Sequence, residues 1–96
     1  MPLLQIPLSD GTMMAQELAG ILTVGRNPDN ALALDDGSVS SHHAKIDAGI
    51  GGVFVTDLFS SNGTYVNGAK VMTQKLEDGD QVRFGNVYCI FSAAGA

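Results

Sequence analysis

The stretch "DLFSSNGTYVNG", residues 57–68, holds two Asn-Gly pairs five positions apart, with two serines before the first pair. An Asn-Gly pair between apolar segments is a strong hairpin signal, because both residues tolerate the positive φ angles of a tight turn. The segment "YVNGAKV", residues 65–71, is typical of such a hairpin around Asn67-Gly68. Asn62-Gly63 follows two hydroxyl side chains instead, so it needs a different explanation.

Turn signals recur outside this stretch and separate short apolar segments. They lie at 9–11, 27–30, 35–38, 49–52, 62–63, 67–68 and 77–80. The segments between them alternate or are rich in β-branched residues, as strands prefer. Examples are LLQIPL (3–8), ILTVG (21–25), GVFVTD (52–57) and QVRF (81–84), whereas VYCIF (87–91) is apolar on both faces and is expected deep in a sheet. This pattern predicts an all-β sandwich or barrel.

One segment favours another structure on local propensity. In "MMAQELAGIL", residues 13–22, apolar side chains recur at helical spacing at Met14, Leu18, Ile21 and Leu22. Residue preferences alone therefore predict a short helix here that ends at Gly20.

The length and composition are those of one globular domain. The 96 residues are 45% hydrophobic, with no tryptophan and few aromatics, so the core must be mainly aliphatic. Cys89, the only cysteine, can form neither an internal disulfide nor a thiolate zinc site by itself, and we expect it to be buried. We expect a single domain over 1–96, with a core at about 4–92 and a frayed tail at 93–96.

Charge argues against two classes of partner. The formal net charge is −5, and the basic residues are scattered, so neither nucleic acid nor an acidic membrane surface is expected to bind. The basic residues are Arg26, Lys45, Lys70, Lys75 and Arg83.

The start of the chain lacks the basic region of a signal peptide, and no apolar stretch is long enough to span a bilayer. We expect a soluble, cytoplasmic protein.

Catalytic and metal-binding functions find little support. Ser40, Ser41, His42, His43 and Asp57 are the residue types of a nucleophilic triad, but no G-x-S-x-G elbow holds a serine exposed. On a strand, His42 and His43 would point to opposite faces and could not share a metal ion. No phosphate-cradling glycine motif or calcium loop is present. We expect no enzyme activity, no metal and no cofactor.

Three polar turns remain, and together they suit a phosphate group. Arg26 ends an apolar strand directly after Gly25. The segment "SVSSHHA" (38–44) has two adjacent serines directly before the histidines, and "SSNGT" (60–64) has two adjacent serines directly before an amide side chain. If these turns meet at one end of a sandwich, a guanidinium and several neutral donors surround one point. That set of donors fits a tetrahedral dianion.

The order and spacing of these motifs resemble the forkhead-associated (FHA) domain family. The similarity extends over about residues 4–92. It rests on Gly25-Arg26, on Val39-Ser40-x-x-His43-Ala44-x-Ile46, on Asp57-Leu58-x-Ser60-x-Asn62-Gly63-Thr64, on Val66-Asn67-Gly68, and on Leu76, Gly79-Asp80, Val82, Phe84 and Gly85.

The resemblance implies a fold: a sandwich of eleven strands in two mainly antiparallel sheets, of the FHA/SMAD type. Residues 13–18 would then form a strand and not a helix. It also implies a site at one end of the sandwich that binds phosphothreonine peptides.

The resemblance also assigns roles to residues of that site. Arg26 and Ser40 would contact the phosphate, and Asn62 would hold the peptide backbone. Ser61 occupies a position where, in this family, a hydroxyl or similar group often helps to bind the phosphopeptide. Ser41 occupies a position where the family often has a basic or amide side chain near the phosphate. Supporting roles would fall to Gly25, His43, Asp57, Ser60, Gly63 and Thr64, with His43 bracing the two phosphate loops.

The implied function is a phosphothreonine-dependent module that recruits phosphorylated partners in signalling. Because Ser41 is neutral, Arg26 is the one certain cation of the site, and we expect affinity in the micromolar range or weaker. The alternative is a phospho-independent interaction or oligomerisation module on the same fold, which would use a sheet face or edge strand. The sequence leaves the oligomeric state open.

Overall fold

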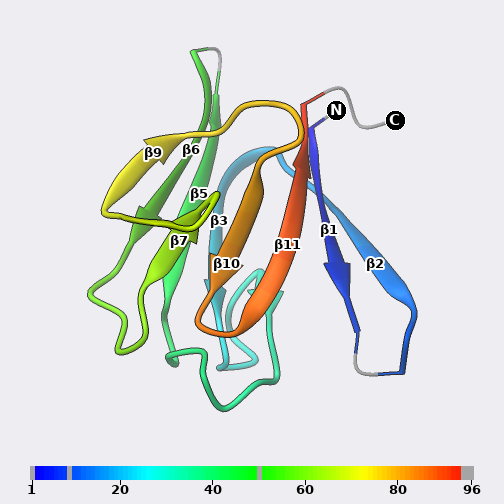
Figure 1. The fold of residues 1–96 in the computed structure, drawn as a ribbon, viewed down its shortest axis with the longest axis vertical. Coiled ribbons are helices and arrows are strands. Elements are labelled where there is room, and N and C mark those ends of the chain that lie inside the picture. Colours follow the sequence, from blue (N-terminus) through cyan, green and yellow to red (C-terminus); the bar gives the residue numbers. More distant parts are fainter. Residues whose placement is uncertain (1, 9, 50, 94–96) are drawn as a thin grey trace.

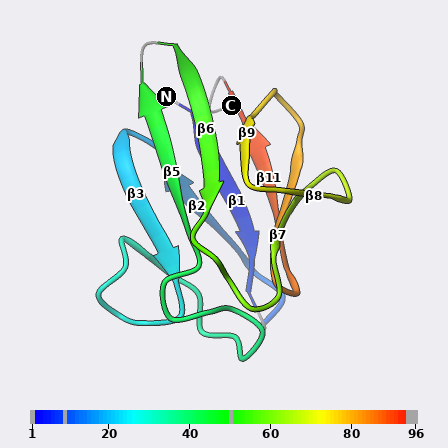
Figure 2. The ribbon, with the colours of Figure 1, turned by 90° about the vertical axis from the view of Figure 1, so that its left-hand side faces the viewer.

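Two β-sheets pack face to face in the computed structural model, which describes residues 2–8, 10–49 and 51–93 (Figure 1, Figure 2). The described residues contain eleven strands and no helix, so the predicted sandwich is confirmed. One sheet has the order β2 (Met13–Glu17), β1 (Leu3–Pro7), β11 (Val87–Ser92), β10 (Gln81–Phe84), β7 (Thr64–Val66), β8 (Ala69–Val71). The other has the order β4 (Leu32–Ala33), β3 (Gly20–Gly25), β5 (Ala44–Gly49), β6 (Gly52–Asp57), β9 (Thr73–Lys75). All strand pairs are antiparallel except β3 with β4.

The core between the sheets is mainly aliphatic, as predicted. In β10, Val82 and Phe84 alternate inward and are fully buried. Cys89 is buried among them, and burial raises the pKa of its thiol to about 12. A thiol in that state is an inert core side chain.

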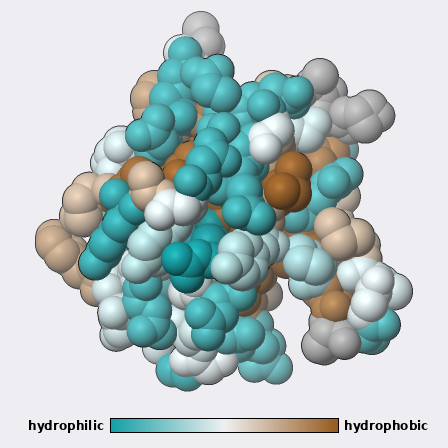
Figure 3. Space-filling model, in the orientation of Figure 1, coloured by the Kyte–Doolittle hydropathy of each residue, from teal (hydrophilic) through white to brown (hydrophobic). Residues whose placement is uncertain are grey.

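The prediction that residues 87–91 lie deep in a sheet is confirmed, but β11 is covered on one face only. β11 lies in the middle of its sheet, between β1 and β10, but Tyr88 is 50% exposed and Ile90 38% exposed. Each sheet of a two-layer sandwich has only one covered face, so half of an apolar central strand faces solvent. Figure 3 shows a mostly hydrophilic face with a few isolated hydrophobic spots.

The helix that propensity predicts for residues 13–22 is wrong, and the strand implied by the family resemblance is right. Residues 13–17 form β2, which pairs with β1 along its whole length, from Leu3 opposite Glu17 to Pro7 opposite Met13. Leu18 then turns into the core, and Gly20 begins β3 at a φ of 65°. Helix propensities of ordinary residues differ by only roughly a few tenths of a kcal/mol per residue. A full ladder of hydrogen bonds to a neighbouring strand outweighs these differences.

Asn67-Gly68 forms the predicted hairpin turn between β7 and β8. Both residues have positive φ, 52° and 87°, as a type I′ turn requires. The Asn67 side chain also donates to the Asp80 carboxylate at 2.9 Å and accepts from the Gln81 N–H at 2.9 Å. This Asn-Gly pair therefore shapes the hairpin and fixes it to the start of β10.

Some expectations fall on residues that are not described. The predicted frayed tail lies outside the described residues except for Ala93, whose N–H donates to Asp78 at 2.9 Å. Ser9 and Ile50, in two of the predicted turns, also lie outside them. Within the described ranges, no helix is long or apolar enough to cross a membrane.

Two glycines let the loop at residues 36–41 pack against the sheets. A Cβ on Gly25 would lie 2.2 Å from the Ser41 carbonyl oxygen, and one on Gly85 would lie 2.4 Å from that of Ser38. Both distances are far inside van der Waals contact, and both neighbours are backbone atoms. The loop can approach β3 and the β10–β11 turn only because these positions lack side chains.

A buried histidine joins two loops at one end of the sandwich. His43 is fully buried and precedes β5. The Ser40 N–H donates to its Nδ1 at 3.1 Å, so the ring proton is on Nε2, which donates to the Gly63 carbonyl at 2.9 Å. The ring also packs edge-on against Phe84, with centroids 5.8 Å apart. His43 thus ties residues 36–43 to residues 58–63.

Asp57 organises the second of these loops. Its carboxylate, which is nearly buried, accepts from the Ser60 N–H at 3.2 Å, from the Ser60 hydroxyl, and from the Thr64 hydroxyl at 2.8 Å. Ser60 Oγ in turn accepts from the Gly63 N–H at 3.0 Å. Burial acts to raise the pKa of Asp57, but the hydrogen bonds from Ser60 and Thr64 together outweigh it, so the pKa lies below its ordinary value.

The Gly25→Ala variant should be markedly less stable. Its methyl group would meet the Ser41 carbonyl, and relieving that overlap should cost about 1–3 kcal/mol of unfolding free energy. Gly37→Ala is a matched control, because a Cβ there meets nothing within 4 Å, and its change should stay within about 0.5 kcal/mol. Urea unfolding measures both. Equal midpoints for the two variants would contradict the close approach.

Asp57→Asn should lower stability at neutral pH by roughly 1.5–3 kcal/mol, because it removes hydrogen bonds to a charged acceptor. A lowered folded-state pKa means that this stabilisation is present above the unfolded-state pKa of about 3.9 and is lost as pH falls through the folded value. Unfolding free energy measured from pH 7 to pH 2 should therefore fall less steeply in the variant than in the wild type. Parallel pH profiles would contradict this role.

Candidate functional site

The three polar turns of the sequence meet at one end of the sandwich, the lower end in Figure 1. The loop after β3 lies beside the loop before β5, because the Arg26 N–H donates to the Ser40 carbonyl at 2.9 Å and the Asn27 N–H to the Ser41 carbonyl at 3.2 Å. The nearly buried Asn30 side chain donates to the Ser41 carbonyl at 2.8 Å. Arg26 is thus fixed next to the two serines.

The loop between β6 and β7 joins this pair through side chains. The Ser61 N–H donates to the Ser40 hydroxyl oxygen at 3.0 Å, which leaves the Ser40 hydroxyl proton to donate elsewhere. The Asn62 amide donates to the Ser38 carbonyl at 2.8 Å, and its oxygen stays available as an acceptor. Ser61 and Asn62 are exposed and Ser40 is half-exposed. A ligand can reach all three.

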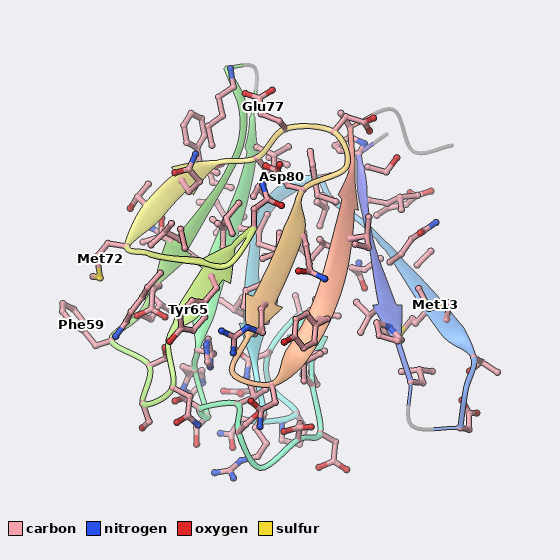
Figure 4. The ribbon with its side chains drawn as sticks, in the orientation of Figure 1. Met13, Phe59, Tyr65, Met72, Glu77 and Asp80 are labelled. Atoms are coloured by element: carbon pink, nitrogen blue, oxygen red, sulfur yellow. The ribbon has the colours of Figure 1, made fainter. Side chains whose placement is uncertain are left out.

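Arg26 is exposed and uncommitted. Within the part of the chain that the structure describes, no carboxylate lies at ion-pair distance from its guanidinium. Arg83 is different, because its guanidinium stacks 3.9 Å from the centre of the Tyr65 ring and donates to the Gly85 carbonyl (Figure 4). Of these two guanidinium groups, that of Arg26 is therefore the one available to an anion.

The remaining predicted residues divide by burial. The half-exposed hydroxyl of Ser41 and the exposed one of Ser61 have no hydrogen-bond partner among the described residues. His42 is exposed and His43 is buried, but neither residue lies in a strand, so the strand geometry considered from the sequence does not apply to them. His42 Nε2 lies 3.1 Å from Asp29, an adjacent acidic side chain.

Ser38 joins the loops of the site through hydrogen bonds that were not predicted from the sequence. Its N–H and hydroxyl donate to Asp36 at 2.9 and 2.6 Å, its carbonyl accepts from Asn62, and its Oγ accepts from the Asn86 N–H at 2.8 Å. The hydroxyl and N–H of Ser38 lower the pKa of Asp36. An Asp-x-Ser spacing is a known turn signal, but nothing in it indicates the long-range contacts to Asn62 and Asn86.

Phe59 shows how firmly the Asp57 hydrogen bonds hold their loop. It has a positive φ of 55°, which is rare for an aromatic residue, and is 91% exposed (Figure 4). Such a conformation persists only where neighbouring contacts determine it. Within the described residues, no group of His, Cys, Asp or Glu side chains could hold a metal ion.

The arrangement can therefore bind an anion through one guanidinium and several uncharged donors. Ser40, Ser41 and Ser61 offer hydroxyl protons, and Asn62 offers an amide beside them. These donors match the oxygens of a phosphate group, while the buried His43 and Asp57 hold the loops from below.

Comparison with known proteins finds relatives that match most of this chain but only part of their own length. An ABC transporter ATP-binding/permease protein of Mycobacterium tuberculosis is 36% identical over 85 residues, 88% of this chain and 10% of that protein. The oxoglutarate dehydrogenase inhibitor of Corynebacterium efficiens is 39% identical over 74 residues, 77% of this chain and 52% of that protein. The chain thus spans about a tenth and about half of these two relatives.

Solved structures agree with the fold. One, from a structural and functional analysis of phosphothreonine-dependent FHA domain interactions, has a TM-score of 0.83 and 33% sequence identity, and the match covers 95% of this chain and 94% of that chain. The family model of the FHA domain matches residues 22–85, more than half of the sequence and every loop of the candidate site. The chain belongs to the FHA domain family.

Proposed function

We propose that this chain is a phosphothreonine-dependent binding module that recruits phosphorylated partners in signalling. The observation that carries the proposal is the position of Arg26: its backbone N–H holds it beside Ser40 and therefore beside the Ser61–Asn62 turn, and its guanidinium makes no ion pair with any described residue. A solved FHA relative studied for phosphothreonine-dependent interactions supports it. FHA domains are binding modules and not enzymes.

Each residue has a distinct role in the proposal. Arg26 and Ser40 contact the phosphate, with Ser41 and Ser61 as additional hydroxyl donors. Asn62 holds the peptide backbone: one of its amide protons binds Ser38, and its oxygen can accept an N–H from the peptide. Gly25, His43, Asp57, Ser60, Gly63 and Thr64 shape the loops.

The proposal extends to the setting of the domain. We propose one FHA domain over residues 1–96, in a cytoplasmic protein. The buried, unreactive Cys89 is compatible with a reducing compartment. The relatives include a protein named as an enzyme inhibitor, and binding a phosphorylated partner is a direct way for a module to regulate that partner.

Arg26→Ala should weaken binding of a phosphothreonine peptide by about 10- to 150-fold, because it removes charge-assisted hydrogen bonds worth roughly 1.5–3 kcal/mol. Fluorescence anisotropy with matched phosphorylated and plain peptides measures this. Lys45→Ala removes the same charge from an exposed position on β5 and should change affinity little. If the wild type binds both peptides equally, the phospho-independent module is the better explanation.

Ser41→Lys should strengthen binding of the phosphorylated peptide about threefold to fivefold at low salt. A cation beside Arg26 would meet the dianion, and an exposed ion pair is worth up to about 1 kcal/mol. The gain should shrink as salt is raised to 0.5 M. Gln5→Lys adds the same charge on the exposed face of β1 and serves as the control. Equal gains in both variants would mean that only net charge matters.

A further inference from the structure

A groove of about 590 Å³ lies beside the candidate site, between the β1–β2 hairpin and residues 33–36. Met14, Leu34 and Val87 give it an apolar floor, and Leu8 and Tyr88 stand at its margins, about half exposed. A hollow between this hairpin and the rest of the molecule is visible at the lower right of Figure 3. None of the residues proposed to contact the phosphate lines this groove.

The polar part of the groove is strongly acidic. Asp10, Asp35 and Asp36 line it, and no lysine or arginine of the described residues does. Two of these carboxylates are fixed: Asp10 accepts from the N–H and hydroxyl of Thr12 at 3.0 and 2.6 Å, and Asp36 accepts from Ser38. They do not converge on a point that could hold a metal ion. Separated carboxylates over an apolar floor complement an extended segment that carries both cationic and aliphatic side chains.

The groove and the candidate site share a wall. Asp36 and Asn86 line the groove, and both hydrogen bond to Ser38, whose carbonyl accepts from Asn62. An extended peptide advances about 3.3 Å per residue, so a peptide held at Asn62 reaches the groove within a few residues. One partner segment can therefore occupy both places.

We propose that this groove binds a lysine- or arginine-containing, aliphatic segment that flanks the phosphothreonine in the same partner. The inference rests on the proposed function, because the phosphothreonine delivers the flank to the groove. It assigns the β1–β2 hairpin a recognition role and makes the preferred partner a basic one. The flank neutralises carboxylates that otherwise repel the phosphate.

The test uses phosphothreonine peptides with one core and three flanks, placed before or after the phosphothreonine: basic with leucine, basic with serine, and acidic with leucine. The wild type should bind the basic leucine flank about tenfold more tightly than the acidic one, with the serine version between them. Asp35→Lys should remove this preference, since Asp35 lines the groove and makes no hydrogen bond among the described residues. Asp47→Lys, the same charge change on the exposed face of β5, should keep it.

The outcomes separate the two proposals. Equal binding of all flanks, with phosphate dependence intact, would overturn the groove and leave the proposed function standing. Equal loss of preference in Asp35→Lys and Asp47→Lys would also overturn it, because only the overall field would then matter. Binding of the basic leucine peptide that depends on Asp35 but not on phosphate would support the groove and contradict phosphothreonine dependence.

Discussion

The candidate site depends on the two hydrogen bonds of one buried imidazole. His43 accepts from the Ser40 N–H and donates to the Gly63 carbonyl, so it fixes two loops that come from different parts of the chain. The same Gly63 carbonyl also accepts from the Gly85 N–H at 3.1 Å, which brings the β10–β11 turn to this point. A buried donor or acceptor left unpaired costs about 1–3 kcal/mol, so the three loops favour one mutual arrangement.

This arrangement also explains why serine, histidine and aspartate side chains gather here without forming a catalytic triad. Ser40 offers His43 its backbone N–H, while its hydroxyl faces Ser61. The imidazole therefore has no contact through which it could take the hydroxyl proton, as nucleophilic catalysis requires. Asp57 lies 4.0 Å from the ring, and its carboxylate is occupied by the Ser60 and Thr64 hydroxyls. The residue types are those of an enzyme, but their hydrogen bonds are those of a scaffold.

Features encoded by neighbouring residues could be predicted from the sequence, and features that depend on distant contacts could not. The Asn67-Gly68 hairpin follows from two residues that tolerate positive φ. Residues 13–17 form a strand because β1 is available to pair with them, which local propensity cannot register. The exposed face of β11 follows from which layer covers it. The family pattern predicts binding roles for Ser40 and Asn62, but Ser38 joins Asn62 to the groove through contacts with residues 24 and 48 positions away in sequence.

An acidic domain that binds a phosphate faces an electrostatic conflict, and the two proposed subsites resolve it together. The net charge of −5 repels a dianion at distance, although salt screens this beyond about 8 Å. Binding of the phosphate alone must then come from short-range hydrogen bonds of Arg26 and neutral donors. A partner segment with a basic flank has an overall charge that is close to neutral or positive. The long-range repulsion between the domain and the phosphate is then removed or becomes an attraction. The acidity that weakens affinity for an isolated phosphate thus becomes a source of selectivity among phosphorylated partners.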